Sequence, residues 1–257
     1  MLYQIRAYLK FLFKSTNQHG VHSPFVFDLI TKCFYDKTYY ENYSNIEHYR
    51  KSLLKNKSTI NITDLGAGSR VSKGNTRLIS QITKNVSTSK HRAKLLFRLV
   101  KYFNSESILE LGTSLGIGTQ AMSLGNPEGK IITIEGCPNI SNFSKEKFKQ
   151  EQLNNVTVLT GDFSDAIDTL KEKTFDFIFL DGNHQKEATL KYFETLLSKA
   201  HNNTVFVFDD IYWSKDMTEA WEVIKQHPKV TVSIDTFFWG FIFFRKEQQK
   251  EHFTIRL

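Results

Sequence analysis

The sequence has little cysteine and little proline. Two Cys in 257 residues exclude a disulfide-stapled secreted scaffold and predict a reducing, cytoplasmic location. Four Pro and 13 Gly exclude a proline-rich or collagen-like chain. No apolar run reaches the roughly 18 residues of a membrane span, and no small-residue cleavage site follows the first apolar stretch, so we expect neither a transmembrane segment nor a secretory signal. The 40% of hydrophobic residues and 24% of charged residues are typical of a globular protein.

The net charge of +7 is unevenly distributed along the chain. Residues 1–105 hold 18 Lys and Arg against 5 Asp and Glu, whereas residues 106–257 hold 16 against 22. This asymmetry predicts two parts: a basic, helical and loop-rich N-terminal extension that caps the sheet, over residues 1–105, and a main domain over residues 106–257. Within the extension, helical periodicity predicts helices over 2–13, 25–34 and 92–103.

The first predicted helix is amphipathic. Its apolar residues recur at helical spacing, with basic residues between them: Leu2, Ile5, Leu9, Leu12 and Phe13, with Arg6, Lys10 and Lys14. We expect this helix to pack on its own domain through the apolar residues. The alternative is an anchor on a membrane surface.

The main domain alternates strand-like and helix-like segments. Five short apolar runs predict buried strands, at 106–112, 130–136, 155–162, 174–182 and 203–210. Helical patterns lie between them, at 140–152, 185–199 and 214–226. Such alternation predicts an α/β fold, a Rossmann-like doubly wound parallel sheet covered on both faces. The last two runs, 229–235 and 238–246, lie too close together for a helical crossover and predict a terminal antiparallel hairpin.

Two glycine-rich loops compete for the ligand that such a sheet binds at the carboxyl ends of its strands. The loop over 110–118 follows a good strand, precedes a helix-compatible segment, and is followed by a strand ending in Glu135. The loop over 64–69 follows a weak polar run, and no strand follows it. We therefore assign the ligand to the loop over 110–118. We interpret the loop over 64–69 as a turn in the extension that could instead line the substrate side.

The glycine spacing favours S-adenosylmethionine over a dinucleotide. The pattern G-x-x-x-G-x-G differs from the G-x-G-x-x-G of dinucleotide folds. Glu135 lies 23 residues after Gly112, where a ribose-binding acid is expected; its alternative is a surface strand end. The predicted cofactor-binding residues are Glu110, Gly112, Thr113, Ser114, Gly116, Gly118, Glu135, Gly136, Asp162, Phe163 and Asp181.

The stretch 106–245 resembles class I S-adenosylmethionine-dependent methyltransferases. ILELGTSLGIGT resembles their glycine motif, IITIEG their ribose-binding acid, and GDF their adenine-side turn. The resemblance implies a seven-stranded sheet and places Asp162 at the adenine amino group; the alternative for Asp162 is a turn residue. Within the family the stretch is similar to catechol-type and sugar O-methyltransferases, and HGVHSPFVF and DDIYWS are similar to an uncharacterised bacterial subgroup.

Acidic residues and one histidine follow two of the predicted strands. Asp181 and His184 follow 174–182, and Asp209 and Asp210 end 203–210. Clustered carboxylates repel unless a cation or a proton lies among them, so Asp181, Asp209 and Asp210 are candidate ligands of Mg²⁺ or another divalent cation. The catechol-type family implies an Asp-Asn pair where this chain has Asp209-Asp210, and a catalytic Lys at the position of His184. We predict that His184 is a general base and Asp181 its catalytic partner; capping and a solvated ring are the alternatives.

These features predict a methyltransferase acting on a small hydroxylated acceptor. An RNA (tRNA) methyltransferase is the alternative that the basic extension suggests, but its cations are scattered and nucleic acid is not favoured. A non-catalytic binding or scaffold protein is disfavoured by the intact glycine loop. The sequence leaves open whether the protein is a homodimer.

Overall fold

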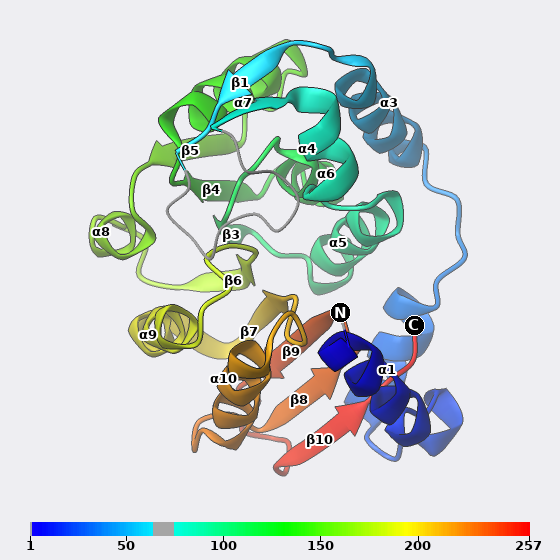
Figure 1. Cartoon of the computed structure of the whole chain (residues 1–257). Coiled ribbons are helices and arrows are strands. Elements are labelled where there is room, and N and C mark those ends of the chain that lie inside the picture. Colours follow the sequence, from blue (N-terminus) through cyan, green and yellow to red (C-terminus); the bar gives the residue numbers. More distant parts are fainter. Residues whose placement is uncertain (1, 64–74) are drawn as a thin grey trace. The chain divides into compact units, whose positions relative to one another are not determined.

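The computed structural model of the protein describes residues 2–63 and 75–257 (Figure 1). The candidate glycine loop at 64–69 therefore lies outside the described residues. Two compact units can be distinguished: a split unit of Met1–Asp36 with Lys171–Leu257, and a central unit of Lys37–Leu170. This division differs from the predicted boundary after residue 105, which stays a prediction. Among the described helices, none is long and apolar enough to cross a membrane.

The central unit contains three parallel strands in the order β3–β4–β5. Their bounds are β3 Ser107–Leu111, β4 Lys130–Glu135 and β5 Val156–Thr160. Leu111 lies opposite Ile134, and Glu135 opposite Thr160, so the three carboxyl ends lie together. The crossover helices are α6 Ile117–Gly125, α7 Pro138–Gln150 and α8 Phe163–Asp168. These strands match the apolar runs, because β-branched residues and leucine suit a sheet that is covered on both faces.

The remainder of the central unit comes from the predicted extension. It comprises α3 Asn42–Lys55, α4 Ile79–Asn85 and α5 Lys90–Phe103, with a small antiparallel pair β1 Thr59–Asn61 and β2 Thr76–Leu78. α3 and α5 pack on each other and on α6, the helix that follows the glycine loop. This part of the extension thus belongs to the glycine-loop unit.

The split unit contains five strands in the order β10–β8–β9–β7–β6. Their bounds are β6 Phe175–Leu180, β7 Ala200–Asp209, β8 Val232–Asp235, β9 Trp239–Phe243 and β10 Glu251–Thr254. β6 pairs parallel with β7, and β8 and β9 form the predicted antiparallel hairpin. β10 adds a parallel strand beside β8, which the seven predicted runs do not include.

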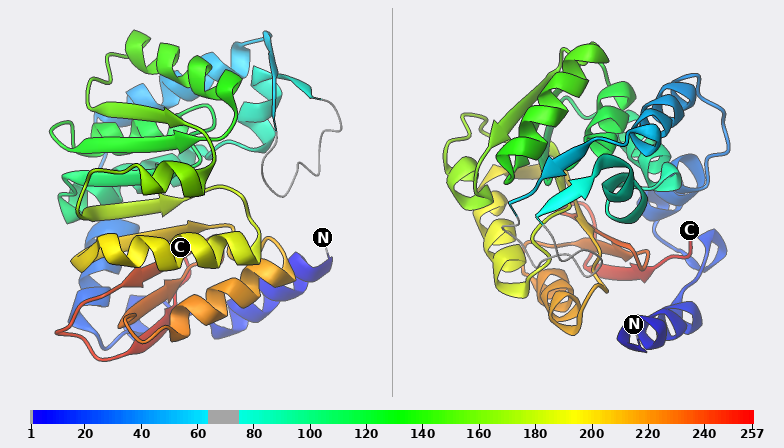
Figure 2. Two further views of the ribbon diagram at one scale, coloured as in Figure 1. Left: turned by 90° about the vertical axis from the view of Figure 1, so that its left-hand side faces the viewer. Right: turned by 45° about the horizontal axis from the view of Figure 1, so that its top comes forward.

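Helices cover both faces of the strands in the split unit (Figures 1 and 2). They are α1 Leu2–Lys14, α2 Pro24–Leu29 with the π-helical turn Ile30–Phe34, α9 Lys186–Leu196 and α10 Lys215–Gln226. Phe34 contacts Phe241 on one face, whereas Trp221 of α10 packs over Gly240 on the other. The predicted helices are confirmed, and the chain before Asp36 joins strands that it precedes by more than 130 residues.

α1 packs through a face that differs from the prediction. Ala7 and Phe11 are its buried residues, and they lie in a cluster with Phe237. Of the predicted apolar set only Leu12 is partly buried against this cluster. The expectation that Leu2, Ile5, Leu9 and Phe13 make the packing face is wrong, because these four side chains are exposed.

Candidate functional site

The glycine turn after β3 folds back onto the end of β4. The backbone N–H groups of Gly112 and Thr113 both donate to the Ile134 carbonyl, at 2.9 and 3.3 Å. Gly112 has φ 106° and Gly116 has φ 77°, a backbone region that glycine adopts without strain. A Cβ atom on Gly116 would lie 2.3 Å from Cε1 of Phe148. The sequence pattern thus has a structural cause: the turn requires glycine at both positions.

Glu135 is held in a fixed orientation at the end of β4. Ser114 N–H donates to its Oε2 at 2.8 Å, and Cys137 N–H donates to its Oε1 at 2.9 Å. Burial raises the pKa of Glu135, while hydrogen bonds from Cys137, Ser114 and Gly136 N–H oppose that rise. Each carboxylate oxygen has two acceptor positions. These N–H groups occupy three of about four acceptor positions, so the carboxylate keeps acceptor capacity for a hydroxyl group of a ligand.

Glu110 lies inside the central unit. It is 1% exposed, and its Oε2 accepts hydrogen bonds from the Thr119 hydroxyl at 2.5 Å and the Thr133 hydroxyl at 2.6 Å. Burial raises the pKa of Glu110 to about 7 against the opposing effect of these hydrogen bonds. A Cβ atom on Gly118 would lie 3.0 Å from Glu110 Oε1. Glu110 thus ties β3 to β4 and α6, a role different from the cofactor contact predicted from sequence.

Two side chains that sequence analysis missed also hold the glycine turn. Tyr49 of α3 is buried, and its hydroxyl donates to the Leu115 carbonyl at 2.9 Å. Ser144 of α7 donates to the Ser114 carbonyl at 2.6 Å. Neither residue belongs to a recognisable motif, because each reaches the turn from a separate helix. The turn is therefore fixed from both flanking helices as well as from β4.

Asp162 and Phe163 lie where β5 passes into α8. Asp162 is the N-cap of α8, and its Oδ1 accepts a hydrogen bond from Ser164 N–H at 2.8 Å. Gly161 has φ 147°, and a Cβ atom there would meet nothing within 4 Å. The turn is open beside Gly161, and contact of Asp162 with an adenine stays a prediction.

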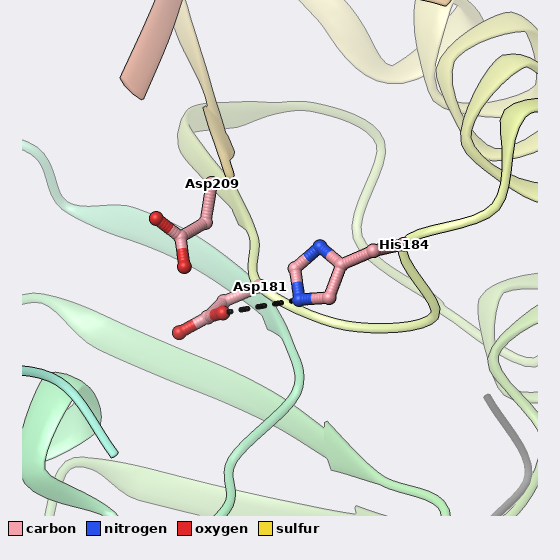
Figure 3. A group of neighbouring side chains, drawn as sticks. All are labelled: Asp181, His184 and Asp209. Carbon is pink, nitrogen blue, oxygen red and sulfur yellow. Dashed lines mark ion pairs between the residues drawn. The ribbon is translucent and has the colours of Figure 1, made fainter. Parts of the chain in front are cut away.

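A second group of functional side chains lies in the split unit, at the ends of β6 and β7 (Figure 3). Asp181 follows β6, His184 lies three residues later, and Asp209 ends β7. One ligand atom from each lies within 4.8 Å of the others. Nε2 of His184 is 3.9 Å from Oδ1 of Asp181. The parallel pairing of Leu180 with Phe208 brings these strand ends together.

Neighbouring aromatic residues hold this group. Asp209 is 7% exposed, and its Oδ1 accepts a hydrogen bond from the indole Nε1 of Trp239 at 2.6 Å. The imidazole of His184 lies beside the Trp213 ring, with 6.2 Å between centroids. Asp210 has φ 52° and belongs to the turn into α10, where its carbonyl accepts from Trp213 N–H. The three-residue group therefore contains His184 in place of Asp210, which the sequence analysis had included among the metal ligands.

The composition of this group sets its chemistry. Two carboxylates so close repel each other, and either a protonated imidazole or a cation relieves that repulsion. Carboxylate and imidazole ligands together suit a divalent transition metal as well as Mg²⁺ or Mn²⁺. The same arrangement can orient a histidine that accepts a proton.

Comparisons with known proteins find relatives in sequence and in fold. Residues 109–211 match the family model described as a methyltransferase domain. A catechol O-methyltransferase of Niastella koreensis is 30% identical over 131 residues, which are 49% of this chain and 58% of that protein. The match therefore spans little more than half the length of this relative.

Solved structures show the same fold. A methyltransferase of Podospora anserina bound to SAH aligns with TM-score 0.62 and 15% identity, over 88% of this chain and 97% of that one. An O-methyltransferase of Bacillus cereus in complex with SAH aligns with TM-score 0.55 and 20% identity, over 82% and 93%. The family match over residues 109–211 and the relative thus make this stretch similar to methyltransferase domains, and the solved structures share the fold of the chain.

Proposed function

We propose that the protein transfers a methyl group from S-adenosylmethionine to a hydroxyl group of a small molecule. The observation that carries the proposal is the anchored Glu135 carboxylate beside the glycine turn, a carboxylate that keeps acceptor capacity for a ribose hydroxyl. The catechol O-methyltransferase named above supports oxygen as the atom that is methylated. The SAH complexes of the structural neighbours support the choice of donor.

The central unit would hold the donor. S-adenosylmethionine supplies an electrophilic methyl group on a sulfonium. Glu135 accepts a hydrogen bond from a ribose hydroxyl, and the absence of a side chain at Gly112 lets the backbone approach the amino acid part. Asp162 and Phe163 lie at the turn proposed for the adenine. Glu110 and Tyr49 position the turn and do not touch the donor.

The split unit would activate the acceptor. His184 accepts the proton of the acceptor hydroxyl, the oxygen forms its bond to the methyl carbon, and the carbon–sulfur bond breaks. Asp181, with Oδ1 3.9 Å from the imidazole Nε2, stabilises the imidazolium that results. The proton then passes from His184 to water.

A divalent cation is a second role for the same group. Asp181, Asp209 and His184 each offer a ligand atom, and these atoms lie within 4.8 Å of one another. The cation would lower the pKa of a bound hydroxyl.

Methyl transfer from labelled S-adenosylmethionine to a panel of catechols, sugars and hydroxy acids tests the proposal, with tRNA as a separate arm. We expect label in a small hydroxylated molecule. Label in tRNA alone, or in none of the panel under conditions where the donor binds, contradicts the proposal.

With the substrate identified in that assay, turnover measurements distinguish general-base catalysis by His184 from cation binding by the group. His184→Gln should lower kcat at least a hundredfold, because general-base catalysis contributes about 10²–10⁴ in rate. Donor affinity should stay unchanged, and His48→Gln, at an exposed histidine, should match wild type.

Unchanged turnover in EDTA would exclude the cation. Activity lost in EDTA, restored by Mg²⁺ or Mn²⁺ and absent in Asp209→Asn would support it.

A further inference from the structure

α1 has a packed face and an opposite face that nothing in the described structure covers. The packed face holds Ala7 and Phe11, whose ring lies 5.5 Å from that of Phe237. Tyr8 flanks it, with its ring centroid 4.8 Å from Phe237. Tyr3 adds a hydrogen bond from its hydroxyl to Thr218 of α10, at 2.7 Å. Figure 2 shows α1 lying along α10.

The opposite face is an apolar stripe. Its four side chains are Leu2, Ile5, Leu9 and Phe13, with exposed fractions of 75%, 52%, 50% and 90%. At about 100° per residue they fall within an arc of about 80°, centred about 180° from the direction of Ala7 and Phe11. The stripe is therefore contiguous along the whole helix, and it points away from the unit on which α1 packs. Isolated exposed apolar residues are ordinary, whereas a continuous stripe indicates a binding surface.

Cations occupy the flank between the stripe and the packed face. Arg6, Lys10 and Lys14 recur every fourth residue, and α1 contains no acidic residue. They also line a cavity of about 480 Å³ between α1 and α10, whose wall includes Lys215 and Lys225. Its two acidic groups are engaged: Glu222 pairs with Lys225 at 2.7 Å, and Asp235 accepts the Tyr212 hydroxyl at 2.6 Å.

We propose that α1 docks this protein on an anionic membrane surface. The stripe enters the boundary between headgroups and acyl chains, and Arg6, Lys10 and Lys14 lie at the level of the lipid phosphates. A second copy of the chain fits less well, because pairing α1 with α1 would bring two rows of cations together. Nucleic acid offers the phosphates but no apolar surface for four exposed aliphatic and aromatic side chains. The proposal is independent of the proposed methyl transfer.

Co-sedimentation with lipid vesicles tests this proposal. We compare phosphatidylcholine vesicles with vesicles that contain about three parts in ten of phosphatidylglycerol. We expect binding to be at least tenfold stronger on the anionic vesicles, and to be lost at about 0.5 M NaCl, because salt screens the headgroup charge. Equal binding to both vesicles, or none to either, overturns the proposal.

Two variants act separately on the stripe and on the cations. Ile5→Ser with Phe13→Ser should reduce vesicle binding at least tenfold, as should Arg6→Glu with Lys10→Glu. Val86→Ser with Val223→Ser, at side chains that are 57% and 53% exposed elsewhere, is the matched control and should bind like wild type. Melting temperatures are measured alongside, and all variants should keep the wild-type value to within about 2 °C because each site is exposed.

Outcomes other than membrane binding are distinguishable. Sedimentation velocity without lipid should give a monomer-dimer balance that the Ile5 and Phe13 variant leaves unchanged. Self-association lost in that variant, without vesicle binding by wild type, would identify a second copy as the occupant and overturn the proposal. Binding to RNA that survives loss of Ile5 and Phe13, again without vesicle binding, would overturn it in favour of nucleic acid.

Discussion

At the residue scale, Glu110 shows how this site uses a buried acid. Its carboxyl group accepts two threonine hydroxyls inside the central unit, where no cation neutralises it among the contacts described. Burial therefore favours the protonated form and raises its pKa to about 7 from an ordinary 4.5. Between these values the folded protein holds a proton that the unfolded chain has lost. The free energy of unfolding consequently falls as pH rises from about 4.5 to about 7.

Glu110→Gln should remove this dependence. Glutamine keeps an oxygen for Thr119 and Thr133 and cannot ionise, so the variant should gain about 3 kcal/mol relative to wild type between pH 4.5 and 7.5. Urea unfolding at a series of pH values measures the difference. Glu128→Gln, at an exposed acid of the same unit, is the control and should follow wild type. A constant difference between Glu110→Gln and wild type across this range would show that Glu110 is ionised throughout.

At the element scale, β9 and α10 meet so closely that a strand position must be glycine. A Cβ atom on Gly240 would lie 2.6 to 2.8 Å from three ring atoms of Trp221, which is itself 1% exposed. Gly240→Ala should therefore cost about 1–3 kcal/mol of unfolding free energy by overpacking. Trp221→Leu removes those ring atoms, so the added cost of Gly240→Ala in that background should fall to less than half. A double-mutant cycle by chemical unfolding measures this coupling, and additive costs would contradict the packing argument.

Elements with a strong local pattern are predictable from this sequence, and those with none are not. The runs that become β3 to β9 are apolar and short, and the helices carry apolar residues at helical spacing. β10 has the polar sequence EHFT and pairs with β8 at the edge of the sheet. Its composition gives no strand pattern, so the sequence did not predict it. The face on which α1 packs was also not predictable. Periodicity reveals an apolar stripe in α1, but burial of Ala7 and Phe11 depends on Phe237, more than 220 residues away.

The candidate site likewise contains residues that the sequence predicts and contacts that it does not. The strand-end positions of Glu135 in the central unit, and of Asp181 and Asp209 in the split unit, could be predicted. Within each unit the carboxyl ends of neighbouring parallel strands meet at the same edge. The bond from Trp239 to Asp209 depends on the antiparallel register of β7 and β9, which the sequence does not specify. Tyr49 reaches the glycine turn from a polar helix of the extension and carries no motif.

At the scale of the whole molecule, acidic and basic residues are distributed over both units. The acidic groups placed at strand ends lie in both units: Glu135 in the central unit, Asp181 and Asp209 in the split unit. The basic N-terminal segment is shared between them, because α1 belongs to the split unit and α3 to α5 belong to the central unit. The excess of cations in residues 1–105 is thus divided between the two units. Its α1 part is the row that we propose for lipid phosphates.

The central claim is that the turn after β3 and Glu135 at the end of β4 bind S-adenosylmethionine. Isothermal titration calorimetry with this donor tests it most directly. We predict one site per chain, and an affinity at least tenfold lower in Glu135→Gln, because hydrogen bonds to a charged acceptor contribute about 1.5–3 kcal/mol. Glu128→Gln should match wild type. Absence of binding at about millimolar donor (a free energy near −4 kcal/mol), or equal affinity of Glu135→Gln and wild type, would contradict the account.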